Sequence, residues 1–174
     1  MELSPISETC NLLETLMIVI KPHHLIDIMK LYGVGVEHFV PDESYQHDFY
    51  KVANCIIENL DTELQYTILG DDICKPCNRF KDSRCSDPLD HIRGYHCKDT
   101  YNQALDSRLI DQLKLDPNAI YTPREFIEML SRDRDIIFHV WLEEDSGLTE
   151  KRNRLFQEGL KKLRNVNGKM QERD

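Results

Sequence analysis

Residues 71–97 read DDICKPCNRFKDSRCSDPLDHIRGYHC and hold four of the six cysteines of this 174-residue chain, Cys74, Cys77, Cys85 and Cys97. The stretch is rich in Asp, Lys, Arg, Pro and Gly and contains no long apolar run. It therefore buries too little apolar surface to offset a backbone ordering cost of about 1–2 kcal/mol per residue. Metal binding supplies this energy, because thiolates bind Zn²⁺ or iron–sulfur clusters strongly in the folded form. We predict a Cys-rich metal-binding loop with these four cysteines as ligands.

The spacing of the cysteines leaves the identity of the metal open. Zinc ribbons usually carry two Cys-x2-Cys pairs, whereas this stretch has one, at Cys74 and Cys77. One pair with separated further cysteines suits an iron–sulfur cluster at least as well, because the irons of a cluster are ligated from separate points of the chain. In an exported protein, the same four cysteines would instead form two disulfides.

The rest of the chain has the size and composition of one globular domain. A chain of 174 residues can bury a real core but is small for two domains. Hydrophobic residues make up 40% and charged residues 30%, ordinary values for a folded protein. The formal net charge of −9 argues against a nucleic-acid partner, because clustered Lys and Arg supply most of that affinity.

Two features of the sequence predict a cytoplasmic location. No apolar run approaches the ~20 residues that span a bilayer, and LMIVI at 16–20 is only strand-sized. Residues 1–10 carry acidic charge and lack the pattern of a signal peptide. We therefore expect no membrane partner, and we expect thiols that stay reduced and available to a metal.

Hydrophobic periodicity predicts a mostly α (α+β) fold. Leu25, Ile28, Met29 and Tyr32 recur at i, i+3, i+4 and i+7, which indicates an amphipathic helix with Gly33 as its end. The β-branched run at 17–21 and the alternating stretch at 64–70 predict a small two-stranded element. Further helices are expected from Asp42 or Ser44 to about Leu60, over 98–115, over 123–130 behind the N-cap Thr122, and from an N-cap at Thr149 onward; the apolar run at 136–142 is expected to be a helix rather than a strand.

The predicted elements divide the chain into three parts. Residues 1–16 are expected to form an N-terminal helical extension. Residues 17–165 are expected to form a single metal-binding domain, and residues 166–174 a frayed tail.

Three segments resemble a known family. IKPHHLIDIMKLYGVG at 20–35, DDICKPC at 71–77 and LDSRLIDQLKLDPNAIYTPREFIEML at 105–130 occur in an order similar to the bacterial and archaeal family called domain of unknown function 1284. The resemblance covers roughly residues 17–130. It implies an iron–sulfur or other metal-binding role without a named activity.

The resemblance also implies site residues. His23, His24, Cys74, Cys77 and Cys85 match the family's characteristic positions. The chain departs from the family at one place.

Asp27 stands where the family typically has a cysteine after its His-His-Leu-Leu segment. Three alternatives follow: Cys97 replaces the missing thiolate, Asp27 is an oxygen ligand, or one iron keeps an open position. An open position would bind substrate, as an open zinc site does.

The paired histidines have a functional and a structural interpretation. His23 or His24 could ligate the metal, act as a general acid or base, or donate hydrogen bonds to cluster sulfur. Alternatively, one caps or packs against the helix start and the other is solvated. His91 and His96 are weaker spare ligands, and we expect Asp71 and Asp72 to accept hydrogen bonds from loop amides near Cys74.

The leading hypothesis is an iron–sulfur protein of redox or sulfur-handling type, with a 4Fe-4S cluster and a redox or sulfur-transfer partner, protein or small molecule. The alternative is a structural zinc module that binds another protein through the basic segment 151–164. A third interpretation is an enzyme that uses Asp27, His23 and His24 at an open metal. The sequence does not specify a substrate, an electron partner or an oligomeric state.

Overall fold

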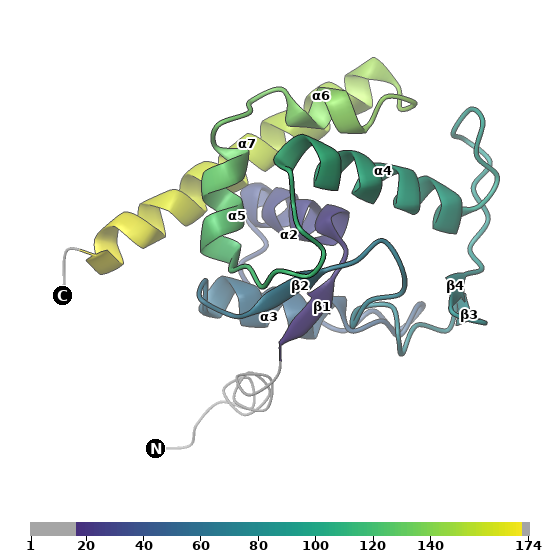
Figure 1. Cartoon of the computed structure of the whole chain (residues 1–174), viewed down its shortest axis with the longest axis horizontal. Helices are drawn as coiled ribbons and strands as arrows, with labels where there is room; N and C mark the ends of the chain where they lie inside the picture. The colour runs from purple at the N-terminus through teal and green to yellow at the C-terminus, as the bar shows by residue number, and fades with distance from the viewer. Residues whose placement is uncertain (1–16, 172–174) are drawn as a thin grey trace.

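The computed structural model describes residues 17–171, with side chains over 17–166. Among these residues it contains six helices and two small sheets of two strands each, which confirms the predicted mostly α (α+β) class (Figure 1). The predicted N-terminal helical extension at 1–16 lies outside the described residues. The elements in chain order are β1 (Ile18–Ile20), α2 (Pro22–Val34), α3 (Phe49–Glu58), β2 (Leu64–Tyr66), β3 (Phe80–Lys81), β4 (Arg84–Cys85), α4 (Lys98–Leu113), α5 (Pro123–Leu130), α6 (Ile136–Val140) and α7 (Ser146–Gln171).

The predicted pairing of the two early strands is confirmed. β1 pairs with β2 in parallel, with Ile18 opposite Leu64 and Ile20 opposite Tyr66. The strands are parallel because α2 and α3 form the crossover between them. Tyr121 adds an antiparallel bridge to Leu64, with backbone N···O distances of 2.7 and 2.8 Å. This short sheet fixes the point at which α2 begins.

Helix α2 runs through the centre of the domain. Leu25, Ile26, Ile28 and Met29 are at most 1% exposed, so the helix is buried on more than the single face that the sequence predicts. It packs against α4 and, over most of its length, against α7. The core of the domain therefore surrounds this helix, and its first turn is held rigidly.

The predicted end of this helix at Gly33 is wrong. The helix continues to Val34, and Gly35 is the C-cap residue with a φ of 109°. Gly33 is instead required by packing, since a Cβ there would lie 2.0 Å from the carbonyl oxygen of Leu155. A Cβ on Gly159 would likewise lie 1.9 Å from the Met29 carbonyl oxygen. The backbones of α2 and α7 touch at these two glycines.

Helix starts were predicted with mixed success. Thr122 caps α5 in a reciprocal capping box with Glu125, and the helix ends at Leu130, both as predicted. The expected helix over 44–60 begins only at Phe49, because the Asp42 side chain accepts the backbone amides of Ser44 and Tyr45 and folds the chain into a turn.

The last two helices were predicted from the sequence, but α7 begins earlier and ends later than predicted. Residues 136–140 form α6, in agreement with the predicted helix. Helix α7 begins at Ser146 rather than behind Thr149, because the Asp145 side chain accepts the Gly147 amide at 2.9 Å. It extends to Gln171, into the segment 166–174 that we predicted to fray. None of the helices described is both long and apolar enough to cross a membrane.

Candidate metal centre

The first two predicted ligands lie in a tight turn. Asp71 Oδ1 accepts the Cys74 amide at 2.9 Å, as predicted, and the Cys77 amide donates to the Cys74 carbonyl at 2.9 Å. The Arg79 amide donates to Cys77 Sγ at 3.4 Å. Backbone donors of this kind stabilise thiolates in metal sites. The turn therefore has the hydrogen-bond pattern that a thiolate ligand at Cys77 requires.

A short hairpin brings Cys85 back towards this turn. Asp82 and Ser83 have φ values of 50° and 62°, the left-handed conformations of a two-residue hairpin loop. Strand β3 then pairs with β4, which places Cys85 opposite Phe80, three residues after Cys77. This hairpin is a compact connection that the sequence prediction did not include.

Cys97 lies next to Cys85. It is the N-cap residue of α4, and its Sγ donates to the Cys85 carbonyl at 3.3 Å. Asp99, in the first turn of α4, accepts the Cys85 amide at 3.0 Å. All four predicted ligands are partly exposed, whereas Cys55 is buried in the core, as its helical position suggested. The four thiols of the Cys loop are therefore more exposed than the thiol of Cys55.

Lys21 is the residue through which the start of α2 meets the Cys loop, residues 71–97. The side chain is almost fully buried, and its Nζ lies 3.6 Å from Cys74 Sγ. Burial lowers the pKa of this amine, but Cys74 and Asp71 more than compensate and raise it. Its amide donates to Asp71 Oδ2 at 2.9 Å. A positive charge is therefore held against the first cysteine.

His24, Asp71 and Cys74 form the one group of potential metal ligands that the described residues bring together, with ligand atoms within 4.8 Å of one another. His24 Nδ1 lies 2.7 Å from Asp71 Oδ2. Burial opposes ionisation of Asp71, but His24 and Lys21 hold the pKa of its carboxyl well below the usual range. Burial and the Asp71 charge raise the pKa of the metal-free Cys74 thiol to about 12.

A second histidine–carboxylate pair lies beside the first. His23 Nδ1 is 2.9 Å from both carboxylate oxygens of Asp106, and the His23 amide donates to Asp106 Oδ1 at 2.8 Å. Burial lowers the pKa of His23, but Asp106 overcomes this effect and raises it. The His23 and His24 rings are 4.3 Å apart between centroids. Two oriented imidazoles therefore stand together at the start of α2.

Asp27 is paired with other residues and is not in the group of potential ligands found among the described residues. It accepts hydrogen bonds from Lys30 at 2.6 Å and from Arg152 at 3.2 Å. His91 and His96 are exposed on the Cys loop, and neither is in the group of potential ligands found among the described residues. Of the predicted residues, His24 and Cys74 belong to this group, His23 lies beside His24, and Cys77, Cys85 and Cys97 are outside the group.

A strap formed by residues 42–48 covers the Cys loop from the side of α3. The Tyr45 carbonyl accepts the Asn78 amide at 2.9 Å, and the Asp48 amide donates to the Ile73 carbonyl at 3.1 Å. These bonds fix the two ends of the Cys74–Cys77 turn. Residues 42–48 were predicted to begin a helix, so the strap was not expected from the sequence.

The chain matches no protein-family model, and no curated protein or solved structure shows significant similarity to it. The resemblance to domain of unknown function 1284 therefore stays a prediction, and the site is interpreted from its own residues.

Lys21 and Asp106 are the two site residues that sequence reasoning missed. Asp106 lies on the buried side of α4 between Leu105 and Leu109, where an acidic residue interrupts an apolar stripe. A buried carboxylate requires a partner, so this interruption was the available signal. Lys21 gave no comparable signal, because it precedes Pro22 in a run that predicts only a strand end.

Proposed function

We propose that Cys74, Cys77, Cys85 and Cys97 hold an iron–sulfur cluster of the 4Fe-4S type, and that this is a cytoplasmic redox or sulfur-handling protein. When bound, such a cluster supplies one-electron chemistry at a potential set by nearby charge and hydrogen bonds. A redox or sulfur-transfer partner, protein or small molecule, follows from that chemistry. The donor set supports the proposal, because four partly exposed thiols come from a loop with little apolar surface of its own.

The observation that carries the proposal is the group of buried charged residues at the start of α2, which contacts Cys74 through Lys21 and Asp71. Lys21, His23, Asp71 and Asp106 are each at most 5% exposed. Burying such groups costs free energy unless each is paired, and apolar residues of similar volume would often be more stabilising. A purely structural zinc site requires only its four thiolates. The charged group is therefore better explained by chemistry at the centre.

The histidines have a defined part in this proposal. A carboxylate accepts hydrogen bonds only, so each Nδ1 carries a proton directed at its Asp partner. This fixes both rings and leaves each Nε2 without a carboxylate partner, as in carboxylate–histidine–metal arrangements. Neither Nε2 has a hydrogen bond within the described part of the chain. His23 and His24 can therefore orient a molecule or move a proton next to the thiolates.

The test is the metal and acid-labile sulfide content of protein purified without air, with its visible absorption spectrum. We expect iron with matching sulfide in the wild type and a reduced or labile cluster in Cys97→Ser. Cys55→Ala is the matched control, because Cys55 is buried in the core away from the Cys loop, and its cluster content should be unchanged. An intact cluster in Cys97→Ser would contradict the proposed ligand set.

Stoichiometric zinc without sulfide would refute the cluster itself and favour the structural zinc module. Function would then lie in partner binding.

A further inference from the structure

A groove lies between the end of α5 and helix α7, remote from the Cys loop (Figure 1). The groove measures about 700 Å³, within the range typical of small-molecule sites. One wall is the connection from Ser131 to Asp135, and the other is the face of α7 from Asn153 to Asn165. It shares no residue with the candidate metal centre, so any ligand here is independent of the proposed cluster.

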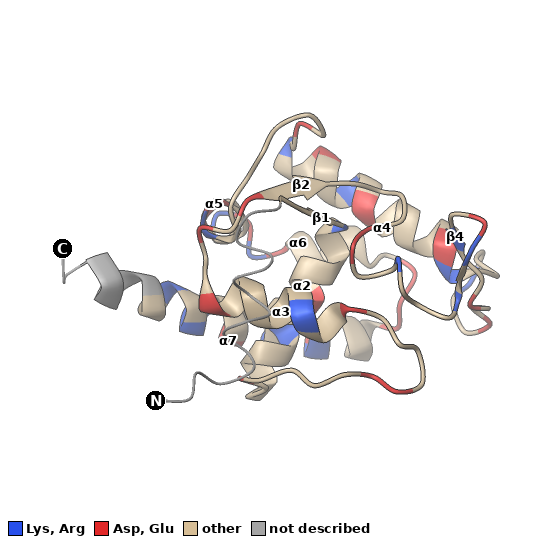
Figure 2. Ribbon diagram, turned by 90° about the horizontal axis from the view of Figure 1, so that it is seen from below, with Lys and Arg blue, Asp and Glu red and all other residues tan. Residues whose placement is uncertain are grey.

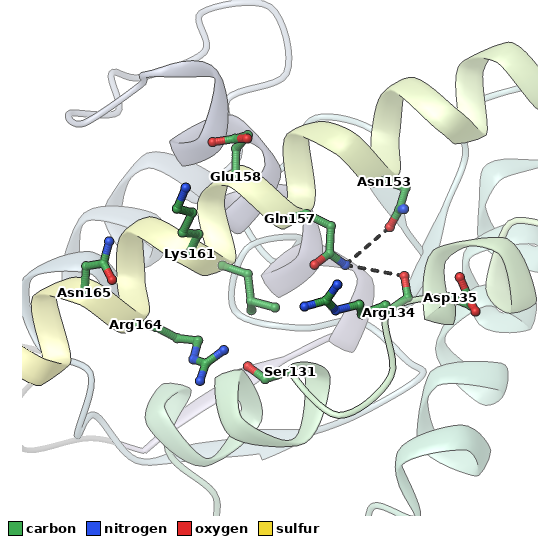
Figure 3. Close-up of a pocket in the computed structure, with 10 residues that line it drawn as sticks. Ser131, Arg134, Asp135, Asn153, Gln157, Glu158, Lys161, Arg164 and Asn165 are labelled. Carbon is green, nitrogen blue, oxygen red and sulfur yellow. Dashed lines mark hydrogen bonds between the residues drawn. The ribbon is translucent and has the colours of Figure 1, made fainter.

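Two arginines reach into this groove from opposite walls. Figure 3 shows the Arg134 and Arg164 guanidinium groups directed into the same space, and Glu158 and Lys161, on another side of α7, also line the groove. The Gln157 amide also lines the groove and donates to the Arg134 carbonyl oxygen at 3.4 Å. The two walls therefore present guanidinium groups and an amide to one space.

The charges of these arginines are not balanced by the protein. Arg108, Arg124 and Arg152 each form an ion pair with a carboxylate. Arg134 and Arg164 form none within residues 17–166, although Asp135 also lines the groove. Arg84, Arg93, Arg132 and Arg154 also form no ion pair among the described residues, so what distinguishes Arg134 and Arg164 is that both line one groove. Like charges repel each other, and an anion between them would remove that repulsion.

The lining also indicates which anion fits. No aromatic residue lines the groove, so a nucleobase or other ring would have no stacking partner. Leu160 is its one apolar lining residue. Guanidinium groups present planar pairs of donors that match phosphate oxygens, and side-chain amides add neutral donors. Basic positions recur along α7 beside the groove (Figure 2).

We propose that this groove binds a small phosphate-bearing anion between Arg134 and Arg164. Arg152 and Lys162, also in the basic segment of α7, are engaged elsewhere, with Glu144 and with the Tyr32 carbonyl. Fewer residues of the basic segment 151–164 are therefore available to bind the anion than the sequence suggests.

The experiment is calorimetric titration of the full chain with inorganic pyrophosphate at low ionic strength. We expect a single saturable site that weakens at least about tenfold in the double variant Arg134→Gln/Arg164→Gln, since two charge-assisted contacts are lost. Both side chains are exposed, so the double variant should fold normally, which circular dichroism checks. Arg154→Gln is the control, because Arg154 is exposed on α7 but does not line the groove.

Three results would overturn the proposal: no saturable binding by the wild type, equal weakening by Arg154→Gln, or citrate binding as tight as pyrophosphate. Removal of metal from the Cys loop by pyrophosphate would give the same heat in all variants, so the comparison separates that effect from the groove.

Discussion

The two ends of α2 are held in the fold by different kinds of residue. At the start, the amides of Lys21 and His23 are accepted by Asp71 and Asp106. The first turn of a helix leaves amides without helical partners, which a Ser, Thr or Asp N-cap usually satisfies locally. Lys21 provides no such side-chain cap. Carboxylates from two distant segments replace it, and this replacement places both histidines.

The other end of α2 contains no buried histidine–carboxylate pair among the described residues. Gly33 and Gly159 let the α2 and α7 backbones touch, and Lys162 Nζ donates to the Tyr32 and Gly33 carbonyl oxygens at 3.2 Å. Close packing at this end stabilises the fold, whereas burying charged groups at the start of α2 costs stability. The buried charged pairs of α2 therefore lie at its start, and its close backbone contact with α7 lies at its end.

Removing the Asp106 carboxylate should have the largest effect on stability. Asp106→Ala leaves the His23 ring and its amide buried without an acceptor, so we expect a loss of about 3 kcal/mol in the free energy of unfolding. Urea denaturation of metal-free protein followed by circular dichroism measures it. Asp106→Asn retains one acceptor and should lose less. A loss of less than 1 kcal/mol in both variants would show that the stability of the start of α2 does not depend on the His23–Asp106 pair.

Gly159→Ala tests the packed end. A Cβ there would lie 1.9 Å from the Met29 carbonyl oxygen, so the helices must separate, at a cost of about 2 kcal/mol. The same denaturation experiment measures the cost. Metal content should remain that of the wild type at temperatures where the variant is folded.

Gly147→Ala is the control for this variant. The nearest atom to a Cβ at Gly147 is Asp145 Oδ1 at 3.2 Å, and no backbone lies that close, so we expect a change within about 0.5 kcal/mol. Equal effects of the two substitutions would mean that the close approach of α2 and α7 is unimportant.

Asp27→Asn tests the middle of α2, between the two ends, and should have the smallest effect. Burial raises the pKa of Asp27, but Lys30 and Arg152 lower it below its usual value. A lowered folded pKa gives stability that is present above the unfolded pKa of about 3.9 and is lost as pH falls through the folded pKa. We expect Asn to cost about 1 kcal/mol near neutral pH and progressively less in acid, measured by urea denaturation at several pH values.

Metal content separates this structural role of Asp27 from the ligand role considered from the sequence. It should be unchanged in Asp27→Asn, and a loss of metal would restore Asp27 as a ligand. Asp111→Asn, an exposed substitution on α4, provides the baseline for the loss of one carboxylate.

Much of the fold followed from local patterns. The α4 helix and the Thr122 capping box depend on neighbours along the chain and on hydrophobic period, and the patterns at 17–21 and 64–70 predicted a two-stranded element but not that its strands are parallel. The late start of α3 was missed because an Asp side chain in a turn competes with the helix for backbone amides. The end of α2 was missed because a glycine needed for packing looks like a terminating glycine in sequence.

The sequence by itself determined the fold class, the Cys loop and the helix start that carries His23 and His24. Only the tertiary structure decided which groups face those histidines. The hydrogen bonds from His23 to Asp106 and from His24 to Asp71 join residues 83 and 47 positions apart. Local periodicity carries no information about such pairs. They form because a buried ionised group requires a partner wherever the folded chain supplies one.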